Sequence, residues 1–386
     1  MKILFLDNDT FAKLDMIEAF EDSGYTVDLF WHDEIRTIRS SDFDEAFRLK
    51  TFGAGYDFVF SLNYYQQLSN MCEKYGLKYI SYIYDCPLVA LYSYTVLNKC
   101  NYIFIFDKEQ YLTLRGAGIQ TVYYLPLAAN VRRLSAMNPT SAIHHKLDTE
   151  VSFVGSLYNE VHNLFDTLEG LSDHTKGYLD AIMEAQLKVS GYFFIEELLT
   201  DAVLSDLQKS RAYTHQPDGV ETPSYVYANY FIARKLAEME RTRLLSAISE
   251  RHALKLYTHN STPQLPKAEN MGAIDYYDVM PYVFRCSKIN LNISLRSIRS
   301  GIPLRAFDII GCGGFLLSNY QADFADCFVA GEDFDFYEDE NDLLKKLDYY
   351  LSHDAIRAEI AANGHQKLAE QHTFQHRIRQ MLEVIA

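Results

Sequence analysis

The sequence predicts an α/β protein made of two Rossmann-like domains, each with a parallel sheet, and a helical insertion in the second domain. Two series of short apolar runs alternate with segments of helical periodicity, and a polar link from Arg132 to Asp148 separates them. The length of 386 residues suits two domains better than one core. We expect domains at residues 1–135 and 150–372, an insertion at about 160–250 and a separate last helix at 373–386.

The composition limits the classes of partner. The net charge of −16 disfavours a general nucleic-acid binder, which needs a basic face, so we expect no nucleic-acid partner. There is no apolar run long enough for a transmembrane segment. The six cysteines show no paired spacing, which is typical of reduced thiols and predicts a cytoplasmic protein.

The first domain begins with apolar runs at 2–7, 25–31, 56–62, 77–84, 101–106 and 121–125, which predict six strands. Polar residues follow several of these strands, at the edge where open α/β sheets bind ligands. Asp85 is the first candidate for a general base and Asp9 the second, because each carboxylate follows a strand. The simpler alternative for both is a turn or helix cap. The first strand is not followed by G-x-G-x-x-G, so this domain is expected to meet an acceptor, not a dinucleotide.

The second domain opens with a predicted strand that ends in Gly155 and Ser156. Small residues there allow a diphosphate or a donor sugar to approach closely, although a plain strand-to-helix turn has the same sequence. Strands are also expected at 253–258 and at 288–294, where Asn292 points to the opposite face from its apolar neighbours.

A loop, a short helix and a glycine turn are predicted over residues 300–314. Pro303 suits a first helical position, and the glycines at 311, 313 and 314 end the helix. Arg305 lies in the first turn, where a phosphate would also meet the exposed N–H groups, and Arg299 precedes the loop. Asp308 lies on the same face as Arg305, in a position to bind a ribose diol. The alternative is an amphipathic helix with a surface ion pair; in the binding interpretation both residues would lie outside the core.

The segments Lys288–Ser294, Arg299–Arg305 and Asp308–Gly314 together resemble the C-terminal signature of the CgeB-like glycosyltransferases. The resemblance implies the GT-B fold, in which two Rossmann-like domains face a cleft that binds a nucleotide-sugar. Asp308 matches the second acid of the E-x7-E pair found in related retaining enzymes, which is similar to a ribose ligand. Ser300 stands where the first acid would be, so only half of that pattern is present.

The resemblance also implies roles for loops at the nucleotide base. The loop after the 253–258 strand would lie near the base, and Tyr276 or Tyr277 would pack on it. The last helix would cross back to the first domain. The expected nucleotide-sugar-binding residues are Gly155, Ser156, His259, Asn260, Tyr276, Asn292, Arg299, Ser300, Gly301, Arg305 and Asp308.

Asp333 and Asp335 spell a D-x-D triplet, which holds a divalent metal in glycosyltransferases of the GT-A type. Here the triplet follows the last predicted strand within a run of acids, and we expect a solvated loop. We therefore predict no metal site and no cofactor, with the nucleotide-diphosphate sugar as a substrate.

Three functions remain open from the sequence. The first is a glycosyltransferase of the hexosyltransferase type that moves a sugar, with a UDP-sugar favoured, to a protein or glycan acceptor. The second is a nucleotide-sugar 2-epimerase on the same scaffold, and the third is a non-catalytic nucleotide-sugar-binding protein. The helical insertion is expected to form an acceptor wall or an oligomer contact.

Overall fold

The computed structural model describes residues 1–160 and 163–386, which form two compact units. The first unit contains residues 1–128, 214–221 and 372–386, and the second contains the described parts of 129–213 and 222–371. The predicted α/β fold with two domains is confirmed, since each unit is built on a parallel sheet of six strands.

The sheet of the first unit has the strand order β2-β1-β3-β4-β5-β6. β1 lies between β2 and β3, so the chain order reverses between β1 and β3. The inner strands β1, β3, β4 and β5 are largely buried because helices cover both faces, whereas the edge strand β2 is mostly exposed or partly exposed. Their bounds are β1 Lys2–Leu6, β2 Thr26–Phe30, β3 Phe58–Leu62, β4 Tyr79–Tyr82, β5 Asn101–Ile105 and β6 Val122–Tyr124.

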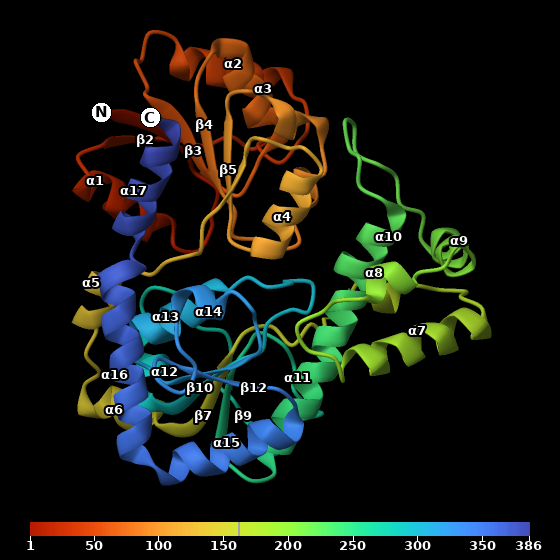
Figure 1. Cartoon of the computed structure of the whole chain (residues 1–386), viewed down its shortest axis with the longest axis vertical. Coiled ribbons are helices and arrows are strands. Elements are labelled where there is room, and N and C mark those ends of the chain that lie inside the picture. The colour runs from red at the N-terminus through yellow and green to blue at the C-terminus, as the bar shows by residue number, and fades with distance from the viewer. Residues whose placement is uncertain (161–162) are drawn as a thin grey trace. The chain divides into compact units, whose positions relative to one another are not determined.

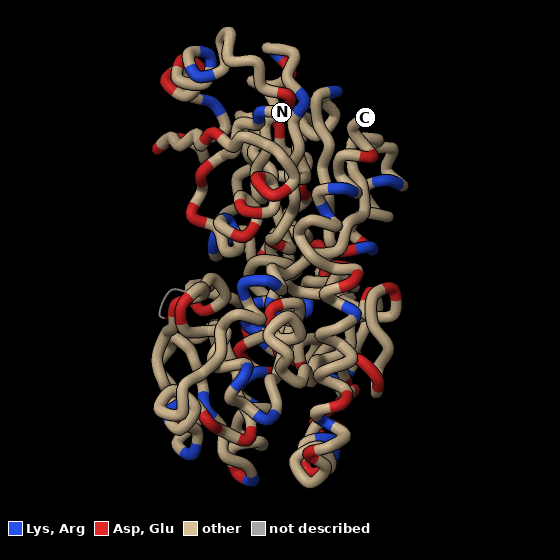
Figure 2. Tube along the Cα trace, turned by 90° about the vertical axis from the view of Figure 1, so that its left-hand side faces the viewer, with Lys and Arg blue, Asp and Glu red and all other residues tan. Residues whose placement is uncertain are grey.

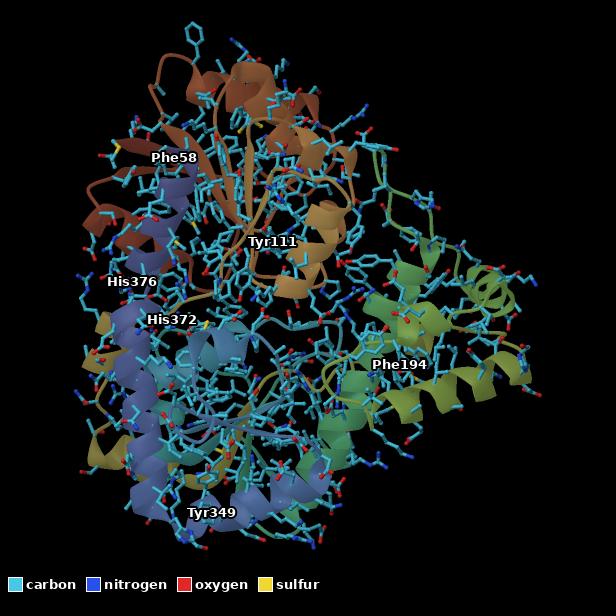
Figure 3. All side chains as sticks on the ribbon, in the orientation of Figure 1. Phe58, Tyr111, Phe194, Tyr349, His372 and His376 are labelled. Atoms are coloured by element: carbon cyan, nitrogen blue, oxygen red, sulfur yellow. The ribbon has the colours of Figure 1, made fainter. Side chains whose placement is uncertain are left out.

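Helices pack on this sheet, and the last helix of the chain lies beside the first (Figure 1). Thr373 caps this last helix, and His376 completes a capping box with it. Arg377 is only 2% exposed and donates hydrogen bonds to the Leu127 carbonyl and to Nδ1 of His372. Figure 3 labels His372 and His376 at the start of this helix. The helices are α1 Lys13–Asp22, α2 Ser41–Thr51, α3 Gln66–Tyr75, α4 Lys108–Gly116 and α17 Phe374–Ile385, with short 3₁₀ turns at Val89–Leu91 and Tyr94–Leu97.

The sheet of the second unit has the order β12-β11-β10-β7-β8-β9, and the chain order reverses between β7 and β10. Such a reversal opens a crevice at the carboxyl ends of the two strands, where α/β proteins bind ligands. The bounds are β7 Thr149–Val154, β8 Leu254–Tyr257, β9 Glu269–Asn270, β10 Ser287–Asn292, β11 Leu316–Asn319 and β12 Asp335–Tyr337.

The polar link between the two series of strands folds as two helices of the second unit. Leu134 of the first of these helices is 1% exposed and lies close to Gly311, where even an added Cβ would come within 2.8 Å of it. This contact explains why the second unit starts at Ala129, ahead of the predicted residue 150. The helices around this sheet are α5 Val131–Ala136, α6 Ser141–Leu147, α12 Met280–Cys286, α13 Leu304–Gly311, α14 Phe324–Cys327, α15 Glu340–Ser352 and α16 Asp354–Gln371.

The helical insertion is a series of helices between β7 and β8, as the sequence predicts. It ends in one long continuous helical stretch that contains a π-helical segment at Tyr227–Ile232. Its other helices are α7 Asp173–Gln186, α8 Ile195–Leu198, α9 Asp201–Ser210, α10 Pro223–Val226 and α11 Ala233–Ser249, with a short turn at Phe165–Thr167. One loop of the insertion, residues 214–221, packs with the first unit.

Charged residues of both signs are interspersed along the trace of each unit (Figure 2). The excess of acidic residues is therefore not confined to one segment. Within residues 1–160 and 163–386, no helix combines the length and the apolar composition that a bilayer crossing requires.

Candidate active site

In the second unit, the carboxyl end of β7 lies against the first turn of α13. β7 ends at Val154, and Gly155 and Ser156 follow. Arg305 donates a hydrogen bond from Nη1 to the Val154 carbonyl, and a Cβ built on Gly155 would lie 3.6 Å from the same nitrogen. The structure thus brings together Gly155 and Arg305, two residues that the sequence analysis assigned to one site.

A second arginine, Arg241 of α11, lies at the same turn, and the sequence analysis missed it. It is 8% exposed, and its guanidinium donates to the carbonyls of Ser156 and Ile293, the latter at 2.5 Å. The guanidinium carbon also lies 4.8 Å from the ring centroid of Tyr158. These hydrogen bonds join the turn after β7 to the end of β10. Arg241 also brings a second positive charge to this edge of the sheet.

The Asp308 carboxylate lies close enough to act on Arg305. Burial lowers the pKa of the Arg305 guanidinium; Asp308 opposes this shift and Arg241 adds to it. The Nε atoms of both arginines are buried and have no hydrogen-bond partner in the part of the chain that the structure describes. Two guanidinium groups with buried Nε donors suit a phosphate group.

Asp308 and Tyr276, both predicted site residues, are in contact. The Tyr276 hydroxyl donates to Oδ1 of Asp308 at 3.0 Å, and the carboxylate is 2% exposed. The expectation that this residue lies outside the core is therefore wrong. The reason is that α13 is buried from Ala306 to Gly311, with α5 and α16 packed on it, so its polar residue faces protein.

Ser156 and Asn260 join the loops after β7 and β8. The Asn260 side-chain oxygen accepts from the backbone N–H of Leu157 at 2.7 Å and lies 3.2 Å from Ser156 Oγ. Glu160 accepts from Ser156 Oγ at 2.7 Å, and His259 Nε2 lies 3.2 Å from the same carboxylate. Burial raises the pKa of Glu160, but these hydrogen bonds outweigh it and leave the pKa lowered. Three predicted residues therefore meet around an acid that the sequence analysis did not single out.

Asn292 is 6% exposed at the end of β10, and its amide nitrogen donates to the hydroxyls of Ser294 and Ser318 at 3.0 and 2.9 Å. These hydrogen bonds tie β10 to β11. In this structure the Asn292 amide holds the strand ends that border the site.

Ahead of α13, the three predicted site residues differ in how far they are exposed. Ser300 is 2% exposed, and its carbonyl accepts from the Asp323 N–H at 3.0 Å; Gly301 beside it is also buried. Arg299 is partly exposed and lies 3.4 Å from the Glu196 carboxylate of α8. Pro303, predicted as the first helical residue, occupies the cap position, one residue before the helix begins at Leu304.

In the first unit, both predicted bases line one cavity at the carboxyl edge of the sheet. Its volume is about 500 Å³, within the usual range for small-molecule sites. The cavity lies where the strand order reverses between β1 and β3. It is lined by Asp9, Thr10, Phe11, Ile35, Arg36, Thr37, Ile38, Asn63, Tyr64, Tyr65, Gln66, Asp85, Leu88, Val89, Ala90 and Gln216.

Of the two acids, Asp85 is fixed more firmly, because it forms two hydrogen bonds with Asn63. Asn63 donates to Asp85 Oδ2 at 2.8 Å, and its own side-chain oxygen accepts the Asp85 N–H at 3.0 Å. The Asp85 side chain opens onto solvent in the cavity, yet the surrounding walls desolvate it and raise its pKa, which Asn63 and Arg36 partly oppose. Asp9 is fully exposed, 3.7 Å from Lys13. A fixed carboxylate with a raised pKa is the better proton acceptor.

The acids of the D-x-D triplet are not solvated, so that expectation is wrong. Asp333 is 9% exposed and accepts from Lys367 at 2.8 Å; Asp335 is 7% exposed and accepts from Lys346 and Tyr350 at 3.1 and 2.8 Å. The two carboxylates therefore pair with lysines of α15 and α16. Among the described residues, no group of three or more His, Cys, Asp or Glu side chains is arranged to hold a metal ion.

Comparisons with known proteins agree with this architecture. Residues 234–383 match the family model described as Glycosyl transferase-like. No curated protein matches the chain by sequence. A sucrose-phosphate synthase from Thermosynechococcus elongatus has a similar structure, with a TM-score of 0.58 and 12% identity over 100% of this chain and 98% of that one. Residues 234–383 therefore resemble glycosyl transferases, and the structural likeness shows the GT-B fold.

Two further structures are similar to this chain over nearly their whole length. Anabaena HepE, solved in complex with UDP-glucose, gives a TM-score of 0.56 at 9% identity and covers 100% of this chain and 99% of its own. WaaG, a glycosyltransferase involved in lipopolysaccharide biosynthesis, gives 0.51 at 9% identity and covers 98% of each chain. At such low identity these likenesses show the fold, and the predicted GT-B fold is confirmed.

Proposed function

We propose that this protein is a glycosyltransferase that moves a sugar from a UDP-sugar to a hydroxyl of a protein or glycan acceptor, in the cytoplasm and without a divalent metal. We also propose that it is of the CgeB-like type. The observation that carries the proposal is the pair of arginines, half-buried Arg305 and buried Arg241, at the Gly155–Ser156 turn. Uridine is favoured because HepE, a protein of similar fold, was solved with UDP and with UDP-glucose.

The diphosphate would bind at the turn after β7, next to Arg305. As the bond between the anomeric carbon and the diphosphate oxygen breaks, negative charge grows on the leaving group. A preorganised guanidinium stabilises such charge most strongly in the transition state, and the N-terminus of α13 adds its partial positive charge. In this proposal the arginines take the role that a metal ion has in other transferases.

The nucleoside would bind through Asp308, Tyr276 and the loop of His259 and Asn260. A carboxylate accepts hydrogen bonds from a ribose diol, and the Asp308 carboxylate already accepts one from the Tyr276 hydroxyl at this place. Because these contacts are similar before and during the reaction, they would set the affinity for the sugar donor more than the rate.

The acceptor would bind in the cavity of the first unit, with Asp85 as general base. The acceptor oxygen forms the new bond to the anomeric carbon, its proton passes to the Asp85 carboxylate, and the nucleoside diphosphate leaves. Asp85 is preferred over Asp9 because Asn63 fixes its orientation and the cavity raises its pKa. The helical insertion is our proposed oligomer contact.

The first experiment measures UDP release from UDP-glucose with EDTA present. We expect release above the spontaneous rate, and calorimetry should show UDP binding that GDP and CMP do not match. Activity that EDTA abolishes and Mn²⁺ restores would contradict the metal-free proposal. An absence of both UDP binding and UDP release would contradict the function itself.

A further inference from the structure

Residues 214–221, the 214–221 loop, lie between α9 and α10 of the helical insertion but pack with the first unit. Two backbone hydrogen bonds attach the loop: Tyr94 N–H to the Asp218 carbonyl at 3.0 Å, and Val220 N–H to the Tyr92 carbonyl at 2.8 Å. Together they form an antiparallel bridge between Ser93 and Gly219. The loop is therefore joined to the first unit in a fixed register.

The tip of the loop is a tight turn that holds its shape. The Gly219 N–H donates to the Gln216 carbonyl at 2.9 Å, which closes a four-residue turn with Pro217 and Asp218 at its centre. Asp218 has a left-handed φ of 64°, as the third position of a type II turn requires, and proline suits the second. The Glu221 carboxylate is 1% exposed and accepts a hydrogen bond from the Gln216 N–H at 3.2 Å, which further stabilises the turn.

This turn places Gln216 on the wall of the cavity that contains Asp85. The Gln216 side chain is half-buried, and it makes no hydrogen bond within the described residues. Gln66 lines the same cavity; it is 6% exposed, and its Nε2 has no partner in the same part of the chain. The 214–221 loop thus adds a third side-chain amide, after those of Asn63 and Gln66, to a cavity where the Gln66 donor has no partner among the described residues.

The lining of the cavity indicates what it binds. Amides and hydroxyls supply hydrogen bonds, while Ile38, Leu88 and Val89 supply an apolar wall. Asp9 and Asp85 outnumber the single basic residue of the lining, Arg36, so an anionic group would be repelled. Uncharged hydroxyls beside an apolar ring face fit this mixture, because the cavity offers neutral donors and an apolar surface together.

We propose that Gln216 is a specificity-determining residue and that the acceptor is a neutral sugar unit of a glycan. The proposal rests on the proposed function, because it assigns the acceptor of that reaction. The 214–221 loop, which belongs to the first unit, then selects the sugar that enters the cavity of that unit.

The test compares the wild type with Gln216→Ala and, as a matched control, Val220→Ala. Val220 is in the same loop, but its side chain is 47% exposed and does not line the cavity. The probes are methyl glycosides of glucose, galactose and N-acetylglucosamine, with glucose 6-phosphate as the anionic probe. Acceptor-dependent UDP release from UDP-glucose gives KM and kcat, and saturation-transfer NMR measures sugar binding without turnover.

We expect at least one neutral glycoside to be used and glucose 6-phosphate to be used far less. Gln216→Ala should raise the KM for the preferred glycoside about 3- to 10-fold, the size of one neutral hydrogen bond, and change the order of preference. Val220→Ala should leave both unchanged. The proposal is overturned by equal KM values in Gln216→Ala and wild type, by an equal loss in both variants, or by use of the anionic probe alone. UDP binding by the wild type, measured separately, tests the function on which the proposal depends.

Discussion

The two units have sheets of the same kind but opposite chemistry where the strand order reverses. Between β1 and β3 there is an open cavity of about 500 Å³ with two carboxylates and one arginine. Between β7 and β10 lie two guanidiniums, those of half-buried Arg305 and buried Arg241, with the Asp308 carboxylate near Arg305. The first arrangement suits proton removal from a neutral acceptor and the second suits an anionic leaving group. A shared fold supplies the location, and the side chains decide the chemistry.

The largest effect expected in this comparison is the loss of the base. Asp85→Asn should lower acceptor-dependent transfer about 10²- to 10⁴-fold, the range for a general base. Because burial raises the pKa of this carboxyl, the folded state favours its neutral form, so the amide should not lower the melting temperature at pH 7. Kinetics and thermal unfolding of one preparation check both points. If Asp9→Asn is the inactive variant instead, the two carboxylates exchange roles.

The second effect concerns the leaving group. Arg305→Ala should lower kcat about 10²- to 10³-fold, because it removes a contact that strengthens as charge develops. Arg243→Ala is the control, since Arg243 also lies in the second unit but is half-exposed, with only long ion pairs at 3.8 and 3.9 Å. Steady-state kinetics with UDP-glucose compare the two. A similar loss in both variants would remove Arg305 from the reaction.

The third effect is on the affinity for the sugar donor. Asp308→Asn keeps an oxygen for the Tyr276 hydroxyl but loses the negative charge, so the KM for UDP-glucose should rise roughly 10-fold with kcat little changed. Asp308→Ala should in addition lower the unfolding free energy by about 1 kcal/mol, since it removes a buried hydrogen-bond acceptor. Denaturant titration of both variants separates the binding loss from the stability loss. An unchanged KM in both would contradict the ribose assignment.

The smallest effect is in the pH profile. As pH falls through the raised pKa of Asp85, the carboxyl becomes protonated and cannot accept the acceptor's proton. Acceptor-dependent transfer should therefore decline at a pH above that of an ordinary aspartate, whereas UDP affinity should not follow the same curve. Rate and affinity measured across the acid range test this. If the rate of transfer and the UDP affinity declined with the same midpoint pH, the titrating group would not be Asp85.

Much of this arrangement could be predicted from the sequence because the signals are local. Pro303 and the glycines at 311–314 bound α13, and the spacing of Arg305 and Asp308 puts both on its first two turns. Asp9 and Asp85 follow strands, which places them at the ligand-binding edge. Such positions depend only on short-range backbone rules.

The spacing of apolar residues around Arg241 could have predicted its buried position from the sequence. In α11 the buried positions recur at 233, 236, 237, 240, 241, 244, 245 and 248, so Glu240 and Arg241 fall on the apolar face of the helix. A charged residue on such a face needs a buried partner, and this predicts a site or a buried ion pair. Glu240 indeed pairs with Arg296 at 2.6 Å.

Other features had no local signal. Gln216 reaches its cavity through pairing between residues 92–94 and 218–220, which are far apart in the chain. Asp333 and Asp335 are buried because the lysines that pair with them come from α15 and α16, later in the sequence. The expectation of a solvated loop failed because charge runs are usually exposed, and only tertiary contacts override that tendency.

The most direct test of the division between the two units is a calorimetric titration of wild type, Arg305→Ala and Asp85→Asn with UDP. UDP carries the charge that the leaving diphosphate develops, so its affinity reports the Arg305 contact without an acceptor. We predict that Arg305→Ala weakens UDP binding about 10- to 100-fold, as for a charged hydrogen bond, and that Asp85→Asn binds UDP like the wild type. Equal affinity in wild type and Arg305→Ala, or a loss in Asp85→Asn alone, would contradict the assignment of the nucleotide to the second unit.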